Sequence, residues 1–345
     1  MKKICFRVDA NQNIGQGHAM RCLSIANELS DNYDAQCIFA VSDESSARFF
    51  TMRKKEVINL GLDYKDYSLF AAKAMLKIIE TEQVSIEIVD SYHVTYEYLS
   101  LLRQAAKTGC FYYGNQVMSV DLLINYNVNY DKSFYEQNYN LKNVELLLGT
   151  EYVPLRKEFS NPKLIKKDTV ENILFLTGGS DPYNVVESMV NEIKSRDDCK
   201  KLKFTFVIGD YSKIKGHQAY EKECDYISYM ASTDKIVDIM KTHDIVVSAG
   251  GITMYELCAL GIPCVIYSMA DNQIPEAKYL GENGYLVYGR DVTTDNFCKM
   301  LLDSIIMLAS SEDACNKISG KMKTLVDGKG CSRIASKIYA LKGDW

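Results

Sequence analysis

The chain lacks the cysteine spacings of a zinc site. Its 11 cysteines are scattered along 345 residues, without a Cys-x-x-Cys pair or a cluster of cysteines and histidines at zinc spacing. Several lie inside apolar runs, where cysteine behaves as a small hydrophobic residue: Cys5, Cys37, Cys258 and Cys264. An odd number of mostly buried thiols, without a signal peptide, predicts a reducing, cytoplasmic location.

Two further absences narrow the class of partner. No apolar run approaches the roughly 18 residues that a membrane helix needs, so we expect no membrane partner. The net charge of −5 gives no general reason to expect nucleic acid. Short basic stretches at 53–55 and 321–323 are typical of solvated faces. With 47% hydrophobic and 25% charged residues, the composition is that of an ordinary globular protein, and the number of subunits stays open.

What is present is an alternation of short β-rich runs with helical patterns, which predicts βαβ units and parallel sheets. In the first half, strands are expected at 4–8, 36–40, 57–60, 86–89, 110–113 and 122–124, and helices at 19–29, 70–81 and 96–108. After a lysine-rich connector at 161–168, strands are expected at 172–176, 203–208, 227–229, 245–248, 264–266 and 285–287. Helices are expected between them at 185–195, 233–242, 253–260 and 273–280, with a tail of two or three helices at 295–308 and 312–341.

A chain of 345 residues is too long for one ordinary core. We therefore predict an α/β protein of two Rossmann-like domains, residues 1–160 and residues 161–345, the latter including the helical tail. Ligands bind outside the carboxyl ends of the strands in such sheets, so the expected site is a cleft between the two domains.

The loop after the first strand carries the strongest functional signal. Gly15-x-Gly17-His18 directly precedes a helical pattern. A helix N-terminus presents unpaired N–H groups that suit an anion, and an imidazole there suits proton transfer near pH 7. A lone histidine is more often structural. Of the other three, His217 lies in a polar Lys/Gly segment, His243 precedes an expected strand, and His93 has no glycines beside it. We therefore expect His18 to be functional, as an anion ligand or as a base.

A second glycine pair, Gly250-Gly251, follows the strand expected at 245–248. These glycines allow a pyrophosphate to approach the backbone, and Thr253 is expected to cap the following helix. Glu256 lies one turn into that helix, where its carboxylate can accept both hydroxyls of a ribose. The alternative is that Glu256 complements the helix dipole.

Other polar loops fall at the ends of expected strands. One such loop is Gly178-Gly179-Ser180-Asp181. We expect it either to face a phosphate or to form a tight turn in which Ser180 or Asp181 caps the following helix. Asn272 and Gln273 supply amide groups where a nucleotide or sugar would sit. In the first half, Tyr92 is either a substrate contact or an aromatic lid over the sheet edge, and residues 125–127 form a polar loop on the same rim.

Together these residues resemble the UDP-sugar hydrolases of pseudaminic acid biosynthesis and their spore-coat polysaccharide relatives. The motifs follow in order: Arg7-x-Asp9, Ile14-Gly15-x-Gly17-His18-x-x-Arg21, Val89-Asp90-x-Tyr92, Asn125-x-Asn127, Gly149-x-Glu151-Tyr152-x-x-Leu155-Arg156-x-Glu158-Phe159, Gly178-Gly179-Ser180-Asp181, Ser248-Ala249-Gly250-Gly251-x-Thr253-x-x-Glu256 and Asn272-Gln273. The second glycine element alone is also similar to glycosyltransferases of the two-Rossmann GT-B fold.

The resemblance implies a GT-B fold, a UDP-linked diacetamido-trideoxy sugar as substrate, and no cofactor. His18 matches the position that activates water. Substrate contacts are implied at Arg7, Asp9, Gly15, Gly17, Arg21, Asp90, Tyr92, Asn115, Asn127 and Arg156. Nucleotide contacts are implied at Gly178, Gly179, Ser180, Asp181, Gly250, Gly251, Thr253, Glu256, Asn272 and Gln273. The family often carries acidic residues where this chain has Gly114-Asn115-Gln116, so the identity of the sugar stays open.

The expected reaction needs little acid assistance, because a pyrophosphate leaves as a stable anion. A water directed at C1 by His18 as base would invert the anomeric carbon, with a rate gain of about 10²- to 10⁴-fold from the base. We expect no metal, since no Asp-x-Asp of the metal-dependent type lies in a suitable loop. Two alternatives remain: a GT-B glycosyltransferase with a sugar hydroxyl as acceptor, and a nucleotide-sugar-binding protein without activity. Placing His18 opposite Gly250-Gly251 favours its role as base over that of anion ligand.

Overall fold

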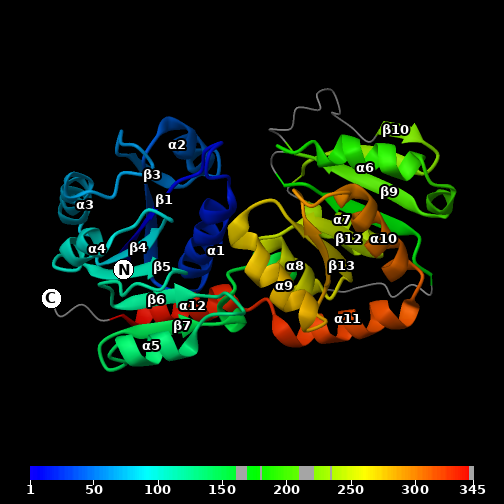
Figure 1. Ribbon diagram of the computed structural model, residues 1–345. Coiled ribbons are helices and arrows are strands. Elements are labelled where there is room, and N and C mark those ends of the chain that lie inside the picture. Colours follow the sequence, from blue (N-terminus) through cyan, green and yellow to red (C-terminus); the bar gives the residue numbers. More distant parts are fainter. Residues whose placement is uncertain (161–168, 179–180, 210–220, 234, 342–345) are drawn as a thin grey trace. The chain divides into compact units, whose positions relative to one another are not determined.

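The computed structural model describes residues 1–160, 169–178, 181–209, 221–233 and 235–341 (Figure 1). The chain divides into two compact units. Unit 1 comprises Met1–Lys157 together with Lys329–Trp345, and unit 2 comprises Glu158–Gly328.

Unit 1 is built on a seven-stranded parallel sheet in the order β3-β2-β1-β4-β5-β6-β7. Its strands are β1 (Lys2–Val8), β2 (Ala35–Val41), β3 (Glu56–Asn59), β4 (Ile86–Asp90), β5 (Lys107–Phe111), β6 (Leu122–Asn125) and β7 (Glu145–Leu148). Its helices are α1 (Gly17–Asn32), α2 (Glu44–Thr51), α3 (Leu69–Thr81), α4 (Tyr96–Leu102), α5 (Lys132–Asn138) and α12 (Gly330–Ala340), with one short 3₁₀ turn, η1 (Thr150–Tyr152), near the end of its first segment.

Unit 2 carries a second seven-stranded sheet, in the order β10-β11-β9-β8-β12-β13-β14, parallel except for β10. Its strands are β8 (Asn172–Leu176), β9 (Lys203–Ile208), β10 (Glu221–Cys224), β11 (Ile227–Ala231), β12 (Ile245–Ala249), β13 (Cys264–Ser268) and β14 (Val287–Asp291). Its helices are α6 (Val185–Lys194), α7 (Ile236–Thr242), α8 (Ile252–Leu260), α9 (Ile274–Glu282), α10 (Phe297–Ala309) and α11 (Glu312–Leu325), with 3₁₀ turns η3 (Asp197–Lys201) and η4 (Asp271–Gln273). A further 3₁₀ turn, η2 (Lys157–Phe159), spans the boundary with unit 1.

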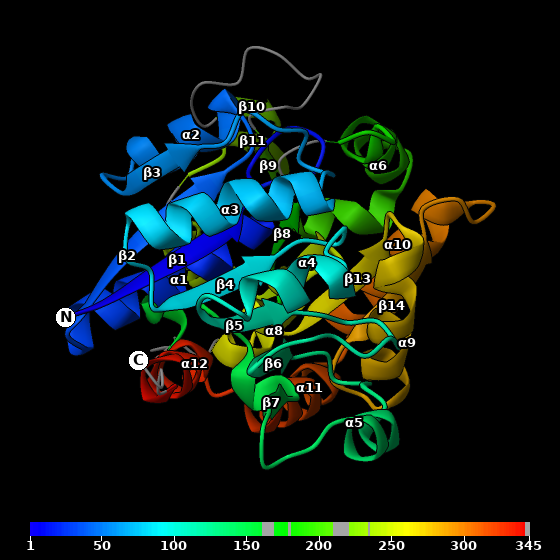
Figure 2. The same ribbon diagram turned by 90° about the vertical axis from the view of Figure 1, so that its left-hand side faces the viewer.

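The central strands are buried on both faces, as parallel sheets require when helices cover both sides. Every residue of β4 is buried, and so are residues 4–8 of β1. On one face, apolar residues of α3 and α4 such as Met75 and Leu99 pack over Cys5 and Val89. Figure 2 looks onto this face, with α3 and α4 in front of the strands. Both helices begin at a hydroxyl cap, Ser68 for α3 and Thr95 for α4.

Each sheet has one point where the strand order reverses. In unit 1 it lies between β1 and β4, and in unit 2 between β8 and β12. The loops that leave the carboxyl ends of such strand pairs are the usual ligand-binding loops of open α/β sheets. They are the loops after Val8 and Asp90 in unit 1 and after Leu176 and Ala249 in unit 2.

The alternating pattern in the sequence correctly predicts two parallel α/β sheets, but the structure corrects several details. The predicted helix at 96–108 ends at Leu102, because residues 107–111 pair with β4 as strand β5. The tail predicted as two or three helices does form three, α10, α11 and α12. Short elements of four to eight residues, α2, α5, β7 and β10, were not predicted.

The tail also differs from the prediction that all of 161–345 forms the second domain. Helix α12 packs against α1 and belongs to unit 1. The Cys331 thiol donates to the carbonyl of Leu155 at 3.1 Å, and Lys2 Nζ donates to the carbonyls of Tyr339 and Leu341. The Cys331 contact joins the last helix to the segment after η1, and the Lys2 contacts join the end of that helix to β1.

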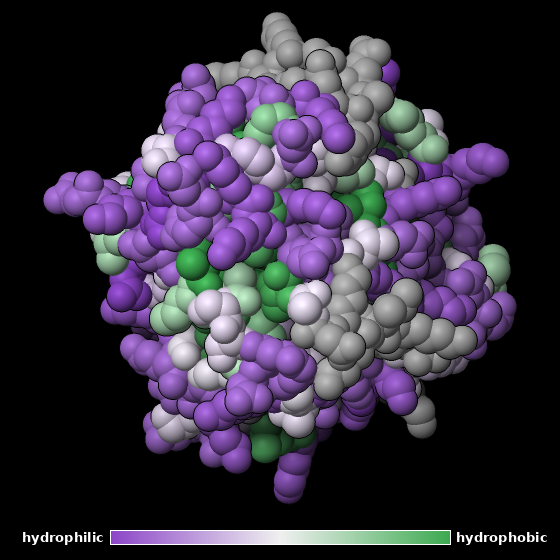
Figure 3. Space-filling view, turned by 90° about the vertical axis from the view of Figure 1, so that its right-hand side faces the viewer, coloured by the Kyte–Doolittle hydropathy of each residue, from purple (hydrophilic) through white to green (hydrophobic). Residues whose placement is uncertain are grey.

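The surface is consistent with an ordinary globular protein. The face drawn in Figure 3 is hydrophilic over most of its area, with a small group of hydrophobic side chains near its centre. Within the described ranges, no helix combines the length and the apolar character needed to cross a membrane.

Candidate functional site

His18 lies at the strand-order reversal of unit 1, in contact with the end of β4. It is the second residue of α1 and is 5% exposed. Its Nδ1 lies 2.7 Å from Oδ1 of Asp90, the last residue of β4. The two residues are 72 positions apart in the chain but meet because β4 pairs with β1, with Asp90 opposite Val8.

Asp90 is surrounded by hydrogen-bond donors. Arg21 donates from Nε to Oδ2 at 2.5 Å and from Nη2 to Oδ1, and the Cys22 thiol donates to Oδ2 at 3.4 Å. Burial by itself raises the pKa of the Asp90 carboxyl, but the charge of Arg21, followed by that of His18, outweighs it and holds this pKa below its usual range. Asp90 is therefore a buried, ionised carboxylate.

Arg21 has further partners on the same side of the sheet. Its Nη1 donates to the hydroxyl of Tyr126 at 2.6 Å, and its guanidinium lies 4.7 Å from the centre of the Phe111 ring. Arg21 and Asp90 are only 5% and 1% exposed. The resemblance implied that both contact substrate, but their charged groups engage protein partners in the interior.

Tyr92 lies beside His18, although the two residues were selected from separate loops. The two rings meet edge to face with centroids 4.6 Å apart. Tyr92 is 62% exposed, while His18 is nearly covered. The base candidate therefore has an exposed aromatic neighbour that carries a hydroxyl.

The glycine loop before His18 has open space around it. Gly15 has φ +75°, in the left-handed region that favours glycine, and its N–H donates to the carbonyl of Asn11 at 2.8 Å. A Cβ added at Gly15 or Gly17 would meet no atom within 4 Å. This room agrees with the expectation that the loop leaves space for a ligand.

Sequence reasoning missed Asn11, which organises this loop. Its Oδ1 accepts hydrogen bonds from the N–H groups of Asn13 and Ile14, at 3.0 and 3.2 Å. Its Nδ2 donates to Asp43, the N-cap of α2, at 2.9 Å. Asparagine commonly bonds the backbone two residues on in a turn, so its position ahead of Asn-Ile-Gly was a usable signal.

Arg7 and Asp9 form a buried pair instead of lining a solvent-accessible surface. Arg7 Nη1 donates to Asp9 at 2.7 Å and Nη2 donates to the hydroxyl of Ser42 at 2.6 Å. Asp9 also accepts from the Ser42 N–H at 2.5 Å. The two residues are 1% and 2% exposed, so in this structure they join the ends of β1 and β2.

The remaining substrate candidates of unit 1 lie in other loops. Asn115 is exposed after β5, while Asn127 and Arg156 are half-buried. The N–H of Asn127 donates to the side chain of Asn125 at 3.0 Å, which shapes the loop after β6. The predicted substrate role of these three residues stays a prediction.

In unit 2, Gly250 and Gly251 connect β12 to α8 at the strand-order reversal. Gly251 is the N-cap, with φ +128°, and α8 begins at Ile252. Thr253 was predicted to cap this helix. That prediction is wrong, because Thr253 is the second residue inside it. Glu256 lies in the second turn, and the first turn has no acidic residue, which argues against Glu256 as a simple complement to the helix dipole.

The predicted amide residues lie close to this glycine turn. A Cβ on Gly250 would come within 2.9 Å of the Cβ of Gln273, so the close approach requires glycine. Gln273 Oε1 accepts from the N–H of Met269 at 2.9 Å, and Asn272 is exposed on η4. The structure therefore brings Gly250 and Gln273 together, although they come from different strand–helix connections.

The other predicted phosphate loop is partly described. Gly178 is exposed with φ +77°, whereas Gly179 and Ser180 lie outside the described residues, as does His217. The carboxylate of Asp181 accepts from the N–H groups of Val185 and Val186, at 2.8 and 2.9 Å. For Asp181 the capping alternative therefore agrees with the structure.

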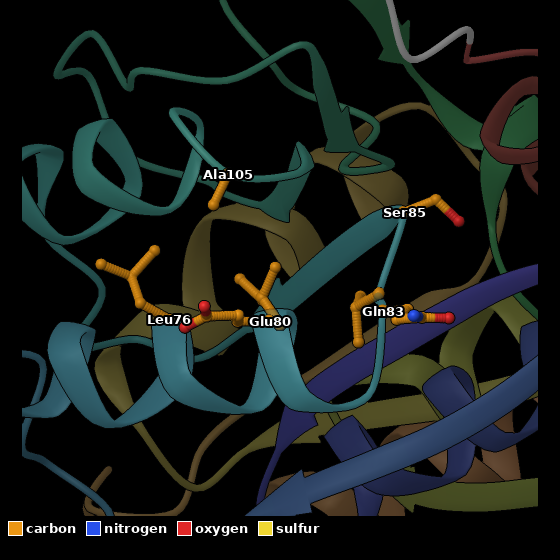
Figure 4. A pocket seen from close by; sticks show the side chains of 7 residues that line it. Leu76, Glu80, Gln83, Ser85 and Ala105 are labelled. Atoms are coloured by element: carbon orange, nitrogen blue, oxygen red, sulfur yellow. The ribbon is translucent and has the colours of Figure 1, made fainter. Parts of the chain in front are cut away.

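A hollow of about 480 Å³ lies elsewhere on unit 1, lined by residues of α3 and of the segments that follow α3 and α4 (Figure 4). Ser85 at its rim precedes β4, whereas Asp90 ends β4. The hollow thus lies at the amino ends of the strands, whereas His18 lies at their carboxyl ends. Among the described residues, no group of three or more His, Cys, Asp or Glu side chains could hold a metal ion.

Residues 173–307 match the model of the glycosyltransferase family 28 C-terminal domain. The chain is 28% identical over 282 residues to the uncharacterized protein MJ1062 of Methanocaldococcus jannaschii, a match that covers 76% of this chain and about half, 55%, of that protein. It is 23% identical over 347 residues to the spore coat polysaccharide biosynthesis protein SpsG of Bacillus subtilis, covering 96% of each chain. It is 22% identical to the UDP-2,4-diacetamido-2,4,6-trideoxy-beta-L-altropyranose hydrolase of Campylobacter jejuni, covering 83% of this chain and 98% of the hydrolase.

Solved structures establish the fold. The MurG structure from Acinetobacter baumannii matches with a TM-score of 0.71 at 12% identity, covering 99% of this chain and all of that chain. The MnaA–UDP structure from S. aureus matches with a TM-score of 0.67 at 14% identity, covering 98% of this chain and 96% of that one. The chain therefore has the GT-B fold, with two Rossmann-like sheets and a glycosyltransferase family 28 C-terminal domain match in the second.

Proposed function

We propose that this chain hydrolyses a UDP-linked sugar, of the diacetamido-trideoxy class, to free sugar and UDP with inversion at the anomeric carbon. The observation that carries the proposal is the His18 imidazole, held by an ionised carboxylate beside an exposed tyrosine and an open glycine loop. The similarity to the Campylobacter hydrolase and to SpsG supports this reaction in nonulosonic acid or surface polysaccharide biosynthesis.

The nucleotide is assigned to unit 2. The N-terminus of α8, with Gly251 as its N-cap, offers N–H groups and a partial positive charge to a diphosphate. Glu256 accepts the ribose hydroxyls from the second turn of α8, and Asn272 and Gln273 supply amide contacts. The sugar and the attacking water are assigned to unit 1, where Gly15 and Gly17 leave room.

The reaction is a single displacement at C1. The water oxygen bonds to C1 as the bond from C1 to the diphosphate oxygen breaks, and the electron pair of that bond leaves with UDP. His18 takes one proton from the water, which supplies a base contribution of about 10²- to 10⁴-fold. The helix N-terminus stabilises the charge that develops on the departing diphosphate. One attack opposite one departure inverts the anomeric carbon.

The proposal is tested with UDP-2,4-diacetamido-2,4,6-trideoxy-β-L-altropyranose in ¹⁸O-labelled water. We expect free sugar and UDP in equal amounts, with ¹⁸O in the sugar and an inverted anomer by NMR. His18→Asn should lose about 10²-fold or more in turnover but bind UDP normally. His93→Asn is the matched control, because His93 is exposed and meets Tyr64 edge to face instead of Tyr92. Persisting turnover in His18→Asn would refute the role of this base.

A glycosyltransferase is the second candidate, favoured by the family 28 match over residues 173–307. The same labelled reaction separates the two. A transferase would release little free sugar without an acceptor and would form a glycoside when a sugar hydroxyl is supplied. Binding of UDP without either product would instead indicate a nucleotide-sugar-binding protein.

A further inference from the structure

We infer that Asp90 and Arg21 are positioning residues that hold His18 in one tautomer, with Nε2 as the basic nitrogen, and that neither contacts the sugar. The inference rests on the proposed role of His18 as base. The hydrogen bonds that hold the two side chains run to protein groups, and both side chains are more than nine-tenths buried.

The contacts of Nδ1 decide the tautomer. Nδ1 lies 2.7 Å from Asp90 Oδ1 and 3.0 Å from Arg21 Nη2. A guanidinium can only donate and an ionised carboxylate can only accept. If Nδ1 carried no proton, its lone pair would face the negatively charged carboxylate of Asp90 at 2.7 Å and would be repelled by it. Nδ1 therefore carries the proton and donates it to Asp90, and the lone pair lies on Nε2.

Arg21 holds the carboxylate in the orientation that this hydrogen bond needs. It contacts both oxygens of Asp90, and its own guanidinium is held by Tyr126 and by the face of Phe111. His18 and Arg21 are three residues apart on α1, so their side chains lie on the same face of the helix and reach the same carboxylate. A buried charge pair of this kind is stable only when its remaining polar atoms have partners, and here they do.

The other ionisable groups around Asp90 do not compete for the proton. Burial, followed by the charge of Asp90, raises the pKa of the Cys22 thiol well above its usual value. Burial also raises the pKa of Tyr113, which faces Arg21 from the end of β5. Tyr92 contacts the ring from the solvent side, and Tyr126 accepts a hydrogen bond from Arg21. The Asp90 carboxylate is thus the acceptor that determines the orientation and the tautomer of the His18 ring.

The first test needs no substrate. In protein labelled with ¹⁵N-histidine, the four histidines give separate signals, and the one lost in His18→Asn is assigned to His18. We expect the neutral ring of His18 to show a protonated Nδ1 and a bare Nε2. Asp90→Asn should remove this preference, whereas Cys22→Ala, which changes a neighbour of the same carboxylate, should keep it. A wild-type ring protonated at Nε2 would overturn the inference.

The second test separates positioning from substrate contact. Asp90→Asn should lower kcat by about 10²- to 10⁴-fold with KM changed less than about threefold, and should move the acid limb of the rate–pH profile. If Asp90→Asn does not fold, Tyr126→Phe removes one support of Arg21 and should lower kcat about 2- to 10-fold with KM unchanged. A rise in KM with kcat retained, in either variant, would show a sugar contact instead. A wild type with the Nδ1–H tautomer but no turnover would refute the proposed hydrolysis and leave the positioning of the ring intact.

Discussion

The rings of His18 and Tyr92 meet edge to face, with centroids 4.6 Å apart and planes at 80°. Because Tyr92 is 62% exposed, we expect its hydroxyl to contact the ligand while its ring supports the histidine. Tyr92→Phe keeps the ring contact and removes one hydrogen bond, so we expect KM to rise about 2- to 10-fold with kcat nearly unchanged. Tyr92→Ala also removes the aromatic pair and should lower kcat as well.

Tyr96→Phe is the control for this prediction, since Tyr96 is 49% exposed in the first turn of α4. Steady-state kinetics with the UDP-sugar should show no change for it. Equal effects of Tyr92→Phe and Tyr96→Phe would argue against a specific contact through the Tyr92 hydroxyl.

The glycines of the loop before α1 should separate stability from activity. Gly17 is the first residue of α1, its φ lies outside the left-handed region, and a Cβ there meets no atom within 4 Å. Gly17→Ala should therefore fold as stably as the wild type but lower kcat/KM about tenfold or more, because the methyl group enters the space assigned to the sugar. Gly15→Ala, at φ +75°, should cost about 1–2 kcal/mol of unfolding free energy. Urea unfolding with kinetics measures both, and full activity in Gly17→Ala would contradict the assignment of this space.

Glu256 and Asp181 are predicted to affect different properties of unit 2. Glu256→Gln should weaken UDP binding about 10- to 100-fold, because a charged acceptor for the ribose hydroxyls is lost. Asp181→Ala removes the acceptor for the N–H groups of Val185 and Val186 and should cost about 1 kcal/mol of unfolding free energy. Its UDP affinity should stay within about twofold by calorimetry. A tenfold loss of UDP affinity in Asp181→Ala at full stability would instead support the nucleotide contact first predicted for Asp181.

Glu87 gives unit 1 a pH-dependent stability. It is fully buried in β4, and neither carboxylate oxygen has a hydrogen-bond partner in the described structure. Burial raises its pKa to about 8, above the usual value of 4.5. The fold favours the protonated form of Glu87. The contribution of this form to the free energy of unfolding is therefore complete below about pH 4.5 and is lost as the pH rises through about 8. Glu87→Gln should be close to the wild type at pH 4.5 and more stable at pH 8, by several kcal/mol and at most about 5.

Thermal unfolding of both proteins across this pH range tests the prediction. Glu80→Gln makes the same change at an exposed position at the end of α3, and its difference from the wild type should not grow with pH. A constant difference between Glu87→Gln and the wild type from pH 4.5 to pH 8 would show that Glu87 is not the group responsible.

Local pattern was enough to predict the sheets and to select the loops at the carboxyl ends of their strands. Residues such as His18, Asp90 and Tyr92 were selected separately, each from the end of a strand or the start of a helix. Their mutual contacts could not be predicted, because they depend on β4 pairing with β1 instead of with β3, and strand order leaves no local signal in the sequence. The resemblance also implied substrate contacts for Arg7 and Asp9, but it gave no sign of the hydrogen bonds that both residues make to Ser42, which follows β2.

The missed elements were short. Helices α2 and α5 have eight and seven residues, too few for a clear apolar period, and β7 and β10 have four residues each. Their positions are set by packing against larger elements, such as α2 against β3. The C-terminal boundary of the second domain was missed for a similar reason. Nothing in the apolar pattern of α12 indicates that this helix packs on α1.

The return of α12 to unit 1 determines the order in which a growing chain can complete its parts. Unit 2 is one continuous segment, whereas unit 1 needs residues from both ends of the chain. As the ribosome releases the chain, the segment 158–328 is free to close its sheet while the apolar positions of α1 that face α12 still lack their cover. Unit 1, whose synthesis begins first, is therefore completed only after all of unit 2 has been made.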